Sequence, residues 1–221
     1  FLVYFQPYTN TYAPVERLRK LYDEALVVDD IVGMSISTRP DCLPDDVVEL
    51  LAEFSQKTYL WVEVGLQSAH NKTMELTNRL HTVEEFSDAV RRLKEKKLRV
   101  CVHLIYGLAG ETEADMRATM DYVTALPIDG IKIHNIYVSR HTILEDWYNA
   151  GKFTPIEKLE DQRNPILFSF NNSFISGNLS YQPVVPTTKF VPVSLQIWML
   201  PITDSAAEKS IATSTVFKSV S

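Results

Sequence analysis

Cysteine is scarce in this sequence. Only Cys42 and Cys101 occur among 221 residues, and they lie far apart in the chain. Two such residues cannot build a disulfide framework, and their spacing is not that of a close pair of metal ligands. We therefore expect two buried, free thiols and a reducing compartment, either the cytoplasm or an organelle matrix.

An excess of positive charge is also missing, and so is any long apolar run. The formal net charge is −6, whereas a nucleic-acid-binding protein usually has a basic surface patch. A negative net charge does not exclude a local basic groove. No segment has the length and apolar character of a membrane-spanning helix, and residues 1–5 do not read as the start of a signal peptide. We expect no membrane partner.

What the sequence does contain is a regular alternation of apolar, β-rich segments with amphipathic helices. The strand-like segments are 1–5, 31–36, 59–66, 100–105 and 131–137. Strand starts recur roughly every 30 residues, which is the length of a β/α unit and predicts parallel strands with right-handed crossovers. We predict an α/β fold in which residues 1–160 form a partial (β/α) barrel, with a doubly wound open sheet as the alternative.

Several helix ends carry recognisable signals. Thr82 and Glu85 have the spacing of a capping box, and Thr112 can cap the next helix. Gly151 suits the end of a short helix over 144–150. These signals place the helices between the predicted strands.

The composition changes from residue 161 onward. Asn, Ser, Thr and Pro become frequent and helical periodicity ends. We expect residues 161–221 to form an irregular tail, which is a small β appendage, a disordered segment or a stretch unrelated to the barrel. No functional residue is assigned to it.

Polar or glycine-rich residues follow each predicted strand. The working residues of a parallel barrel sit at the carboxyl ends of its strands, so this pattern predicts a rim shaped for a polar ligand. The segments concerned are 6–12, 35–41, 63–68, 103–112 and 132–135.

Four of these segments together resemble the radical S-adenosylmethionine (SAM) enzymes, in particular the YhcC-like group related to Elongator protein 3. In chain order they read YFQPYTNTY, STRPDCLPD, WVEVGLQSAH and HLIYGLAGET. The resemblance covers about residues 1–160. It implies a TIM-like partial barrel that binds SAM and, in the complete protein, a 4Fe–4S cluster that cleaves SAM to a 5′-deoxyadenosyl radical.

The resemblance also implies a set of SAM-binding residues. HLIYGLAGE is similar to the motif that holds adenine, to which Ile105 and Gly107 correspond, although Gly107 could simply form a turn. Gln67 and Arg79 correspond to residues beside the methionyl part, where a guanidinium fork suits the carboxylate. The alternative for Arg79 is an exposed helix-end arginine. The full set is Ser37, Glu63, Gln67, Arg79, His103, Ile105 and Gly107.

Glu63 stands within an apolar strand, where an unpartnered carboxylate is costly. It is therefore a candidate for the SAM amino group or the substrate, or else a member of a buried pair with Lys132 or Arg39. Ser37 and His103 depart from the family pattern, because several relatives have acidic residues near these positions. Serine and histidine can still form hydrogen bonds to the amino or ribose groups of SAM.

A second group of residues is predicted to face the substrate. Gln6, Tyr8 and Asn10 follow the first strand and would face the reaction chamber, unless they only shape the turn. Arg39 lines the site or anchors its loop through Asp41. The complete group is Gln6, Tyr8, Asn10, Arg39 and His134.

The three closely spaced cysteines that hold the cluster in this family do not occur here. In this family the cluster loop follows the first strand of the barrel, so the resemblance implies that the cysteines lie upstream of Phe1. We expect the segment alone to be inactive. Two alternatives remain: a metal-dependent barrel enzyme using His103, His134 and Glu63, or a cluster-free SAM-binding module. Similarity to Elongator protein 3 suggests RNA as substrate, and the cluster would need an electron donor.

Overall fold

The computed structural model describes residues 1–6, 8–155, 197–199 and 218–219. The strands are β1 (Leu2–Phe5), β2 (Gly33–Thr38), β3 (Tyr59–Gln67), β4 (Arg99–Tyr106), β5 (Gly130–Asn135), β6 (Ile197–Met199) and β7 (Lys218–Ser219). The helices are α1 (Val15–Leu26), α2 (Asp45–Lys57), α3 (Asn71–Leu76), α4 (Val83–Glu95), α5 (Glu113–Thr124) and α6 (Ile143–Asn149), with a 3₁₀ helix η1 (Pro40–Cys42) after β2.

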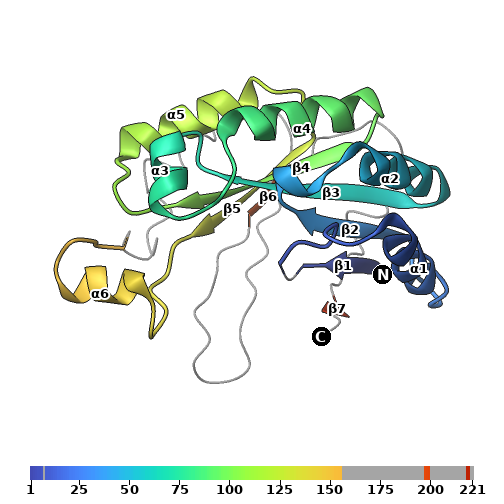
Figure 1. The fold of residues 1–221 in the computed structure, drawn as a ribbon, viewed down its shortest axis with the longest axis horizontal. Coiled ribbons are helices and arrows are strands. Elements are labelled where there is room, and N and C mark those ends of the chain that lie inside the picture. The colour runs from blue at the N-terminus through green and yellow to red at the C-terminus, as the bar shows by residue number, and fades with distance from the viewer. Residues whose placement is uncertain (7, 156–196, 200–217, 220–221) are drawn as a thin grey trace.

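Strands β1 to β5 are parallel and lie side by side in the order of the sequence. A doubly wound sheet reverses its strand order at a switch point, and this order has no reversal, so that alternative is wrong. The sheet is curled, and helices α1 to α5 cover its outer face (Figure 1). The five strands therefore form the predicted partial barrel.

The two faces of the sheet differ because side chains alternate along each strand. On β3, Leu60, Val62, Val64 and Leu66 are buried among the helices. Glu63, Gly65 and Gln67, at the alternate positions, line the hollow on the other face. The outer face is the core, in which a buried large apolar side chain contributes about 1.5–3 kcal/mol.

The predicted helix starts are confirmed. The Thr82 hydroxyl accepts from the Glu85 amide and the Glu85 carboxylate accepts from the Thr82 amide, which is a complete capping box. Thr112 forms the same arrangement with Asp115 at the start of α5. After α6, Gly151 has φ +67° and ends the helix as expected. Helix α3 was not predicted from the sequence.

Most of the predicted tail, 161–221, lies outside the described residues. Within the described part, β6 pairs antiparallel with β5 and β7 pairs parallel with β1, so both extend the sheet at its edges. The division into a barrel and an irregular tail stays a prediction.

No helix in the described part of the chain is long and apolar enough to span a bilayer.

Candidate functional site

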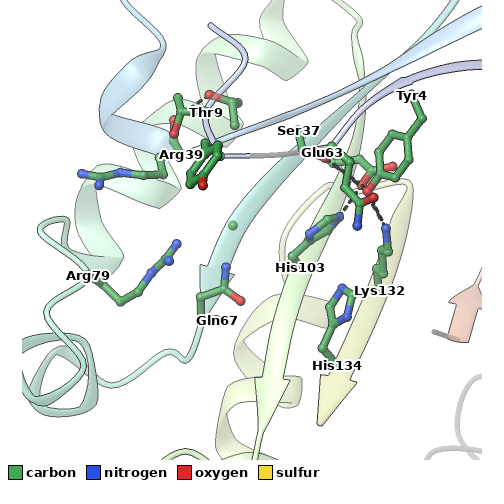
Figure 2. A pocket seen from close by; sticks show the side chains of 14 residues that line it. Tyr4, Thr9, Ser37, Arg39, Glu63, Gln67, Arg79, His103, Lys132 and His134 are labelled. Atoms are coloured by element: carbon green, nitrogen blue, oxygen red, sulfur yellow. Dashed lines mark hydrogen bonds and ion pairs between the residues drawn. The ribbon is translucent and has the colours of Figure 1, made fainter. Parts of the chain in front are cut away.

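The carboxyl ends of the parallel strands surround a cavity of about 390 Å³ on the concave side of the sheet. Figure 2 shows its side chains in two groups, with Arg39 and Arg79 on one side and Tyr4, Glu63, His103 and Lys132 on the other. The lining residues are Tyr4, Gln6, Tyr8, Thr9, Ser37, Thr38, Arg39, Glu63, Gly65, Gln67, Arg79, His103, Lys132 and His134.

Glu63 is the centre of the second group and is completely buried. The hydroxyl of Tyr4 donates to its Oε2 at 2.8 Å, and that of Ser37 donates to the same oxygen at 3.1 Å. Ser35 donates to Oε1, and His103 bonds Oε2 through its Nε2. Both carboxylate oxygens therefore have hydrogen-bond donors.

Lys132 supplies the opposite charge. It is also fully buried, its Nζ lies 3.4 Å from Oε2 of Glu63, and it donates to the Tyr4 hydroxyl at 2.6 Å. Burial raises the pKa of Glu63, but the hydrogen bond from His103 and the charges of His103 and Lys132 outweigh it and lower that pKa to about 2. The pKa of Lys132 is lowered by burial and raised by Glu63, with a net decrease. Of the two partners considered for Glu63, Lys132 is the one it contacts.

Two histidines complete this side of the cavity. Their rings, His103 on β4 and His134 on β5, have centroids 5.5 Å apart. Burial lowers the pKa of His103 more than the hydrogen bond and charge of Glu63 raise it, so the ring is neutral at pH 7. Because a carboxylate only accepts hydrogen bonds, the one ring proton is on Nε2 in the bond to Glu63, and Nδ1 is left as an acceptor. Burial, then His103 and Lys132, lower the pKa of His134 to about 4, so His134 is neutral at pH 7.

The opposite side of the cavity is formed by Arg79, Gln67 and Gly65. Nε of Arg79 is buried and has no hydrogen-bond partner among the described residues. Gln67 has φ +73° at an irregularity in the β3–β4 pairing. A Cβ on Gly65 would lie 2.6 Å from Nε2 of Gln67 and 3.3 Å from an Nη of Arg79, so the absence of a side chain there makes room for both.

The predicted substrate-side residues are placed as follows. Gln6, Tyr8, Arg39 and His134 line the cavity, and Tyr8 is almost fully exposed. Arg39 also donates two hydrogen bonds to Asp41, of 2.9 and 2.6 Å, which anchor its loop. Its role toward a substrate stays a prediction.

Three predicted residues do not line the cavity. Ile105 pairs with His134 across β4 and β5 and lies on the concave side of the sheet. The amide of Gly107 donates to the sulfur of Met116 at 3.3 Å, and φ +79° fits its alternative role in the turn. The side chain of Asn10 donates to the carbonyls of Phe5 and Ser37, which ties the loop after β1 to β2.

Four residues that line the cavity were not singled out from the sequence: Tyr4, Thr9, Thr38 and Gly65. Ser35, which donates a hydrogen bond to Glu63, was not singled out either. A signal for two of them was present. Tyr4 and Ser35 interrupt apolar strands at positions that alternate with core residues, which is the same pattern that singled out Glu63.

The described residues do not form a metal centre. Cys101 is buried and Cys42 half-buried, and both are free. Among the described residues no three His, Cys, Asp or Glu side chains gather into a possible metal site. The three residues of the metal-enzyme alternative, His103, His134 and Glu63, are not such a group. The chain likewise offers no cysteine trio for an iron–sulfur cluster.

Comparison with known proteins identifies the family. The profile of the Radical SAM superfamily matches residues 2–123, more than half of the chain. The chain belongs to the radical SAM superfamily. It is 41% identical over 162 residues to YhcC of Escherichia coli, covering 73% of this chain and 52% of YhcC. It is 32% identical over 128 residues to the tRNA uridine(34) acetyltransferase of Dehalococcoides mccartyi, covering 56% of this chain and 27% of that protein.

The solved structures agree with the fold. Elp3 of Methanocaldococcus infernus aligns with a TM-score of 0.60 at 21% identity, covering 70% of this chain and 41% of that one. At this identity the likeness establishes the radical SAM half-barrel alone. The resemblance to YhcC and to Elongator protein 3 is thus confirmed, while the chain spans about half the length of YhcC.

Proposed function

We propose that this chain forms the SAM-binding core of a radical SAM enzyme, with SAM lying in the cavity at the carboxyl ends of β1 to β5. The observation that carries the proposal is Arg79. Its guanidinium lines the cavity, its Nε is buried, and no described residue satisfies that nitrogen. A cation held in this way is ready for an anionic group of a ligand.

The carboxylate of SAM is the group that suits Arg79. A guanidinium offers two parallel N–H donors, which match the two oxygens of a carboxylate. Burial is the main reason why the pKa of Arg79 is lowered, and nearby Arg39 lowers it further. A bound carboxylate would stabilise the charged form of Arg79 and so offset both the burial and the repulsion from Arg39. Gln67 lies beside it and has a side-chain amide that can bind the amino-acid part of SAM.

The rest of SAM would extend along the sheet toward β4. Ile105 on the concave side offers an apolar surface for adenine, and Gly107 follows at the end of the strand. Nδ1 of His103 can accept a hydrogen bond from a ribose hydroxyl of SAM, while Glu63 holds the imidazole ring of His103 in place. Ser37 lies beside Glu63 on the same wall. Glu63 itself acts through His103, because its oxygens are already occupied.

In the whole protein, we propose that SAM is cleaved reductively to methionine and a 5′-deoxyadenosyl radical, with the electron delivered by a 4Fe–4S cluster on cysteines outside this chain. An electron donor for the cluster is then required. The contribution of the described residues is to bind and orient SAM and to exclude water from it. A reducing compartment, the cytoplasm or an organelle matrix, suits the free thiols of this chain.

The substrate would contact Gln6, Tyr8, Arg39 and His134, all of which line the cavity. The likeness to a tRNA uridine(34) acetyltransferase makes RNA a candidate substrate class. The net charge of −6 gives it no further support.

Calorimetry tests the binding proposal directly. The 221-residue chain is titrated with SAM at neutral pH, and one site per chain is expected. For the radical step, the whole protein with a reconstituted cluster is incubated with SAM and dithionite. Formation of 5′-deoxyadenosine is the expected product, and this chain alone should give none. Failure of the first titration would defeat the proposal for the cavity.

A further inference from the structure

The loop that carries Arg79 has an unusual backbone. Arg79 lies between Asn78 and Leu80, which have φ +54° and +59°. Residues other than glycine avoid this left-handed region because Cβ approaches the following carbonyl. Two such residues on either side of one arginine imply that surrounding contacts hold the loop in this form.

His81 makes one of those contacts. It is 5% exposed, and its Nδ1 lies 3.1 Å from the carbonyl oxygen of Arg79. A carbonyl oxygen only accepts hydrogen bonds, so Nδ1 carries the proton and donates. Nε2 is buried and has no partner among the described residues. The imidazole of His81 is thus a neutral ring whose one N–H is hydrogen-bonded to the backbone carbonyl of Arg79.

The ring is kept neutral by its surroundings. A proton on Nε2 would create a buried cation without a partner beside the guanidinium of Arg79. Burial and then the charge of Arg79 lower the pKa of His81. The hydrogen bond to the Arg79 carbonyl is therefore present in the same form across neutral pH.

Both ends of the loop are fixed. On one side the Arg79 amide donates to the Met74 carbonyl at the end of α3. On the other, Thr82 follows His81 directly and belongs to the capping box that starts α4. The amide of Val83 also donates to the side chain of Asn71, at the first turn of α3. His81 therefore connects Arg79 to a rigid helix end.

We propose that His81 is a positioning residue that fixes Arg79 for the carboxylate of SAM. The inference rests on the proposed function, because it assumes that Arg79 binds this carboxylate. His81 does not line the cavity, so it acts on the ligand only through Arg79. Its loss should weaken the binding of ligands that carry the amino-acid part and leave other ligands unaffected.

Two ligands separate this role from simple packing. SAM has the methionyl carboxylate, whereas 5′-methylthioadenosine has the adenosine and thioether parts without it. Two variants separate the hydrogen bond from the bulk of the ring. His81→Asn keeps an N–H close to the position of Nδ1, and His81→Leu fills the space without a donor. His81→Gln, whose amide lies further out, is a second variant without the bond should the leucine variant fold poorly.

The dissociation constants are measured by calorimetry on the 221-residue chain. For His81→Leu and His81→Gln, SAM should bind about fivefold more weakly, as expected for one lost hydrogen bond, while 5′-methylthioadenosine binds as in the parent. His81→Asn should restore SAM binding to within about twofold. With Arg79→Met already present, His81→Leu should cause little further loss of SAM binding.

Other outcomes overturn the inference. If both ligands weaken equally in His81→Leu and His81→Gln, His81 has only a packing role. If SAM binding is unchanged in these variants, the hydrogen bond does not position Arg79. A failure of the proposed function looks different: the parent chain does not bind SAM, or Arg79→Met leaves SAM binding intact.

Discussion

The two sides of the cavity differ in how completely their charged groups are satisfied. Glu63 and Lys132 are fully buried, contact each other, and are hydrogen-bonded by the side chains around them. Arg79 is only half-buried, and its Nε has no partner in the part of the chain that the structure describes. The charged groups of the first side satisfy one another, whereas the Nε of Arg79 on the second side is left for the ligand that we propose.

The supporting structure differs in the same way. The residues around Glu63 stand on neighbouring strands of the sheet, whose register fixes them. Arg79 stands on a short loop between α3 and α4. We conclude that substitutions on the first side should change folding stability and that substitutions on the second should change ligand binding.

The largest expected effect is on the Glu63 side. Lys132→Met should lower the free energy of unfolding by about 3 kcal/mol, because it leaves Glu63 buried without its opposite charge. Urea unfolding followed by circular dichroism measures this. Arg91→Met, which removes two exposed ion pairs on α4, is the control and should change stability little.

A second substitution sharpens the first. Adding Glu63→Gln to Lys132→Met should recover part of the lost stability, because the uncompensated charge is then gone. If Lys132→Met is as stable as the parent, the contrast between the two sides of the cavity is wrong.

The pH dependence of stability should reveal the same network. The folded-state pKa of Glu63, about 2, lies below the ordinary 4.5. Its stabilisation is therefore complete above pH 4.5 and is lost as the pH falls toward 2, by about 3 kcal/mol for the full shift. Urea unfolding as a function of pH measures the slope. Glu63→Gln should be less stable at neutral pH and should lack this component of the slope.

His134 contributes in a higher pH window. Its folded-state pKa, about 4, lies below the ordinary 6.5, so its contribution is lost as the pH falls from 6.5 to 4. His134→Gln should flatten the stability profile in that window alone. An unchanged profile between these values would contradict the burial of a neutral ring.

On the other side of the cavity the effect should appear in binding. Arg79→Met should weaken SAM about 10- to 100-fold, the range expected for a lost charge-assisted pair, with unchanged or slightly higher stability. Arg39→Met is the matched control, since the Arg39 guanidinium is already bound to Asp41, and should weaken SAM less than about threefold. Calorimetry gives both values. Equal losses in the two variants would mean that Arg79 has no special role.

The smallest expected effect concerns the space between Gln67 and Arg79. In Gly65→Ala the added methyl group would meet both side chains, at 2.6 and 3.3 Å. SAM should bind about fivefold more weakly, with little change in unfolding free energy, because the side chains can move into the cavity. If Gly65→Ala binds SAM as tightly as the parent, the space beside Gly65 is not needed to hold Gln67 and Arg79 for SAM.

The fold was predictable because its determinants are local. Apolar runs marked the five parallel strands, and the capping residues Thr82 and Thr112 marked two helix starts. Helix α3 was missed because its six residues are mostly polar and carry no helical periodicity. Its position matters, since it directly precedes the loop of Arg79.

The site was predictable only in part. Glu63 could be singled out because a carboxylate interrupts an apolar strand, and Lys132 could be named as a partner. Whether the two meet depends on how strands distant in sequence come into register, which the sequence alone does not show. Gly107 does not line the cavity, and its amide donates to the sulfur of Met116 on α5. The Nε of Arg79 has no partner among the described residues, on a loop with two left-handed residues. Neither arrangement can be read from the sequence.

A crystal structure of this chain with SAM tests the central claim most directly. We predict that the methionyl carboxylate lies within hydrogen-bonding distance of the Arg79 guanidinium, with Glu63 and Lys132 still bonded to each other. SAM bound outside this cavity, or with its carboxylate on Lys132 and Arg79 facing solvent, would contradict the account.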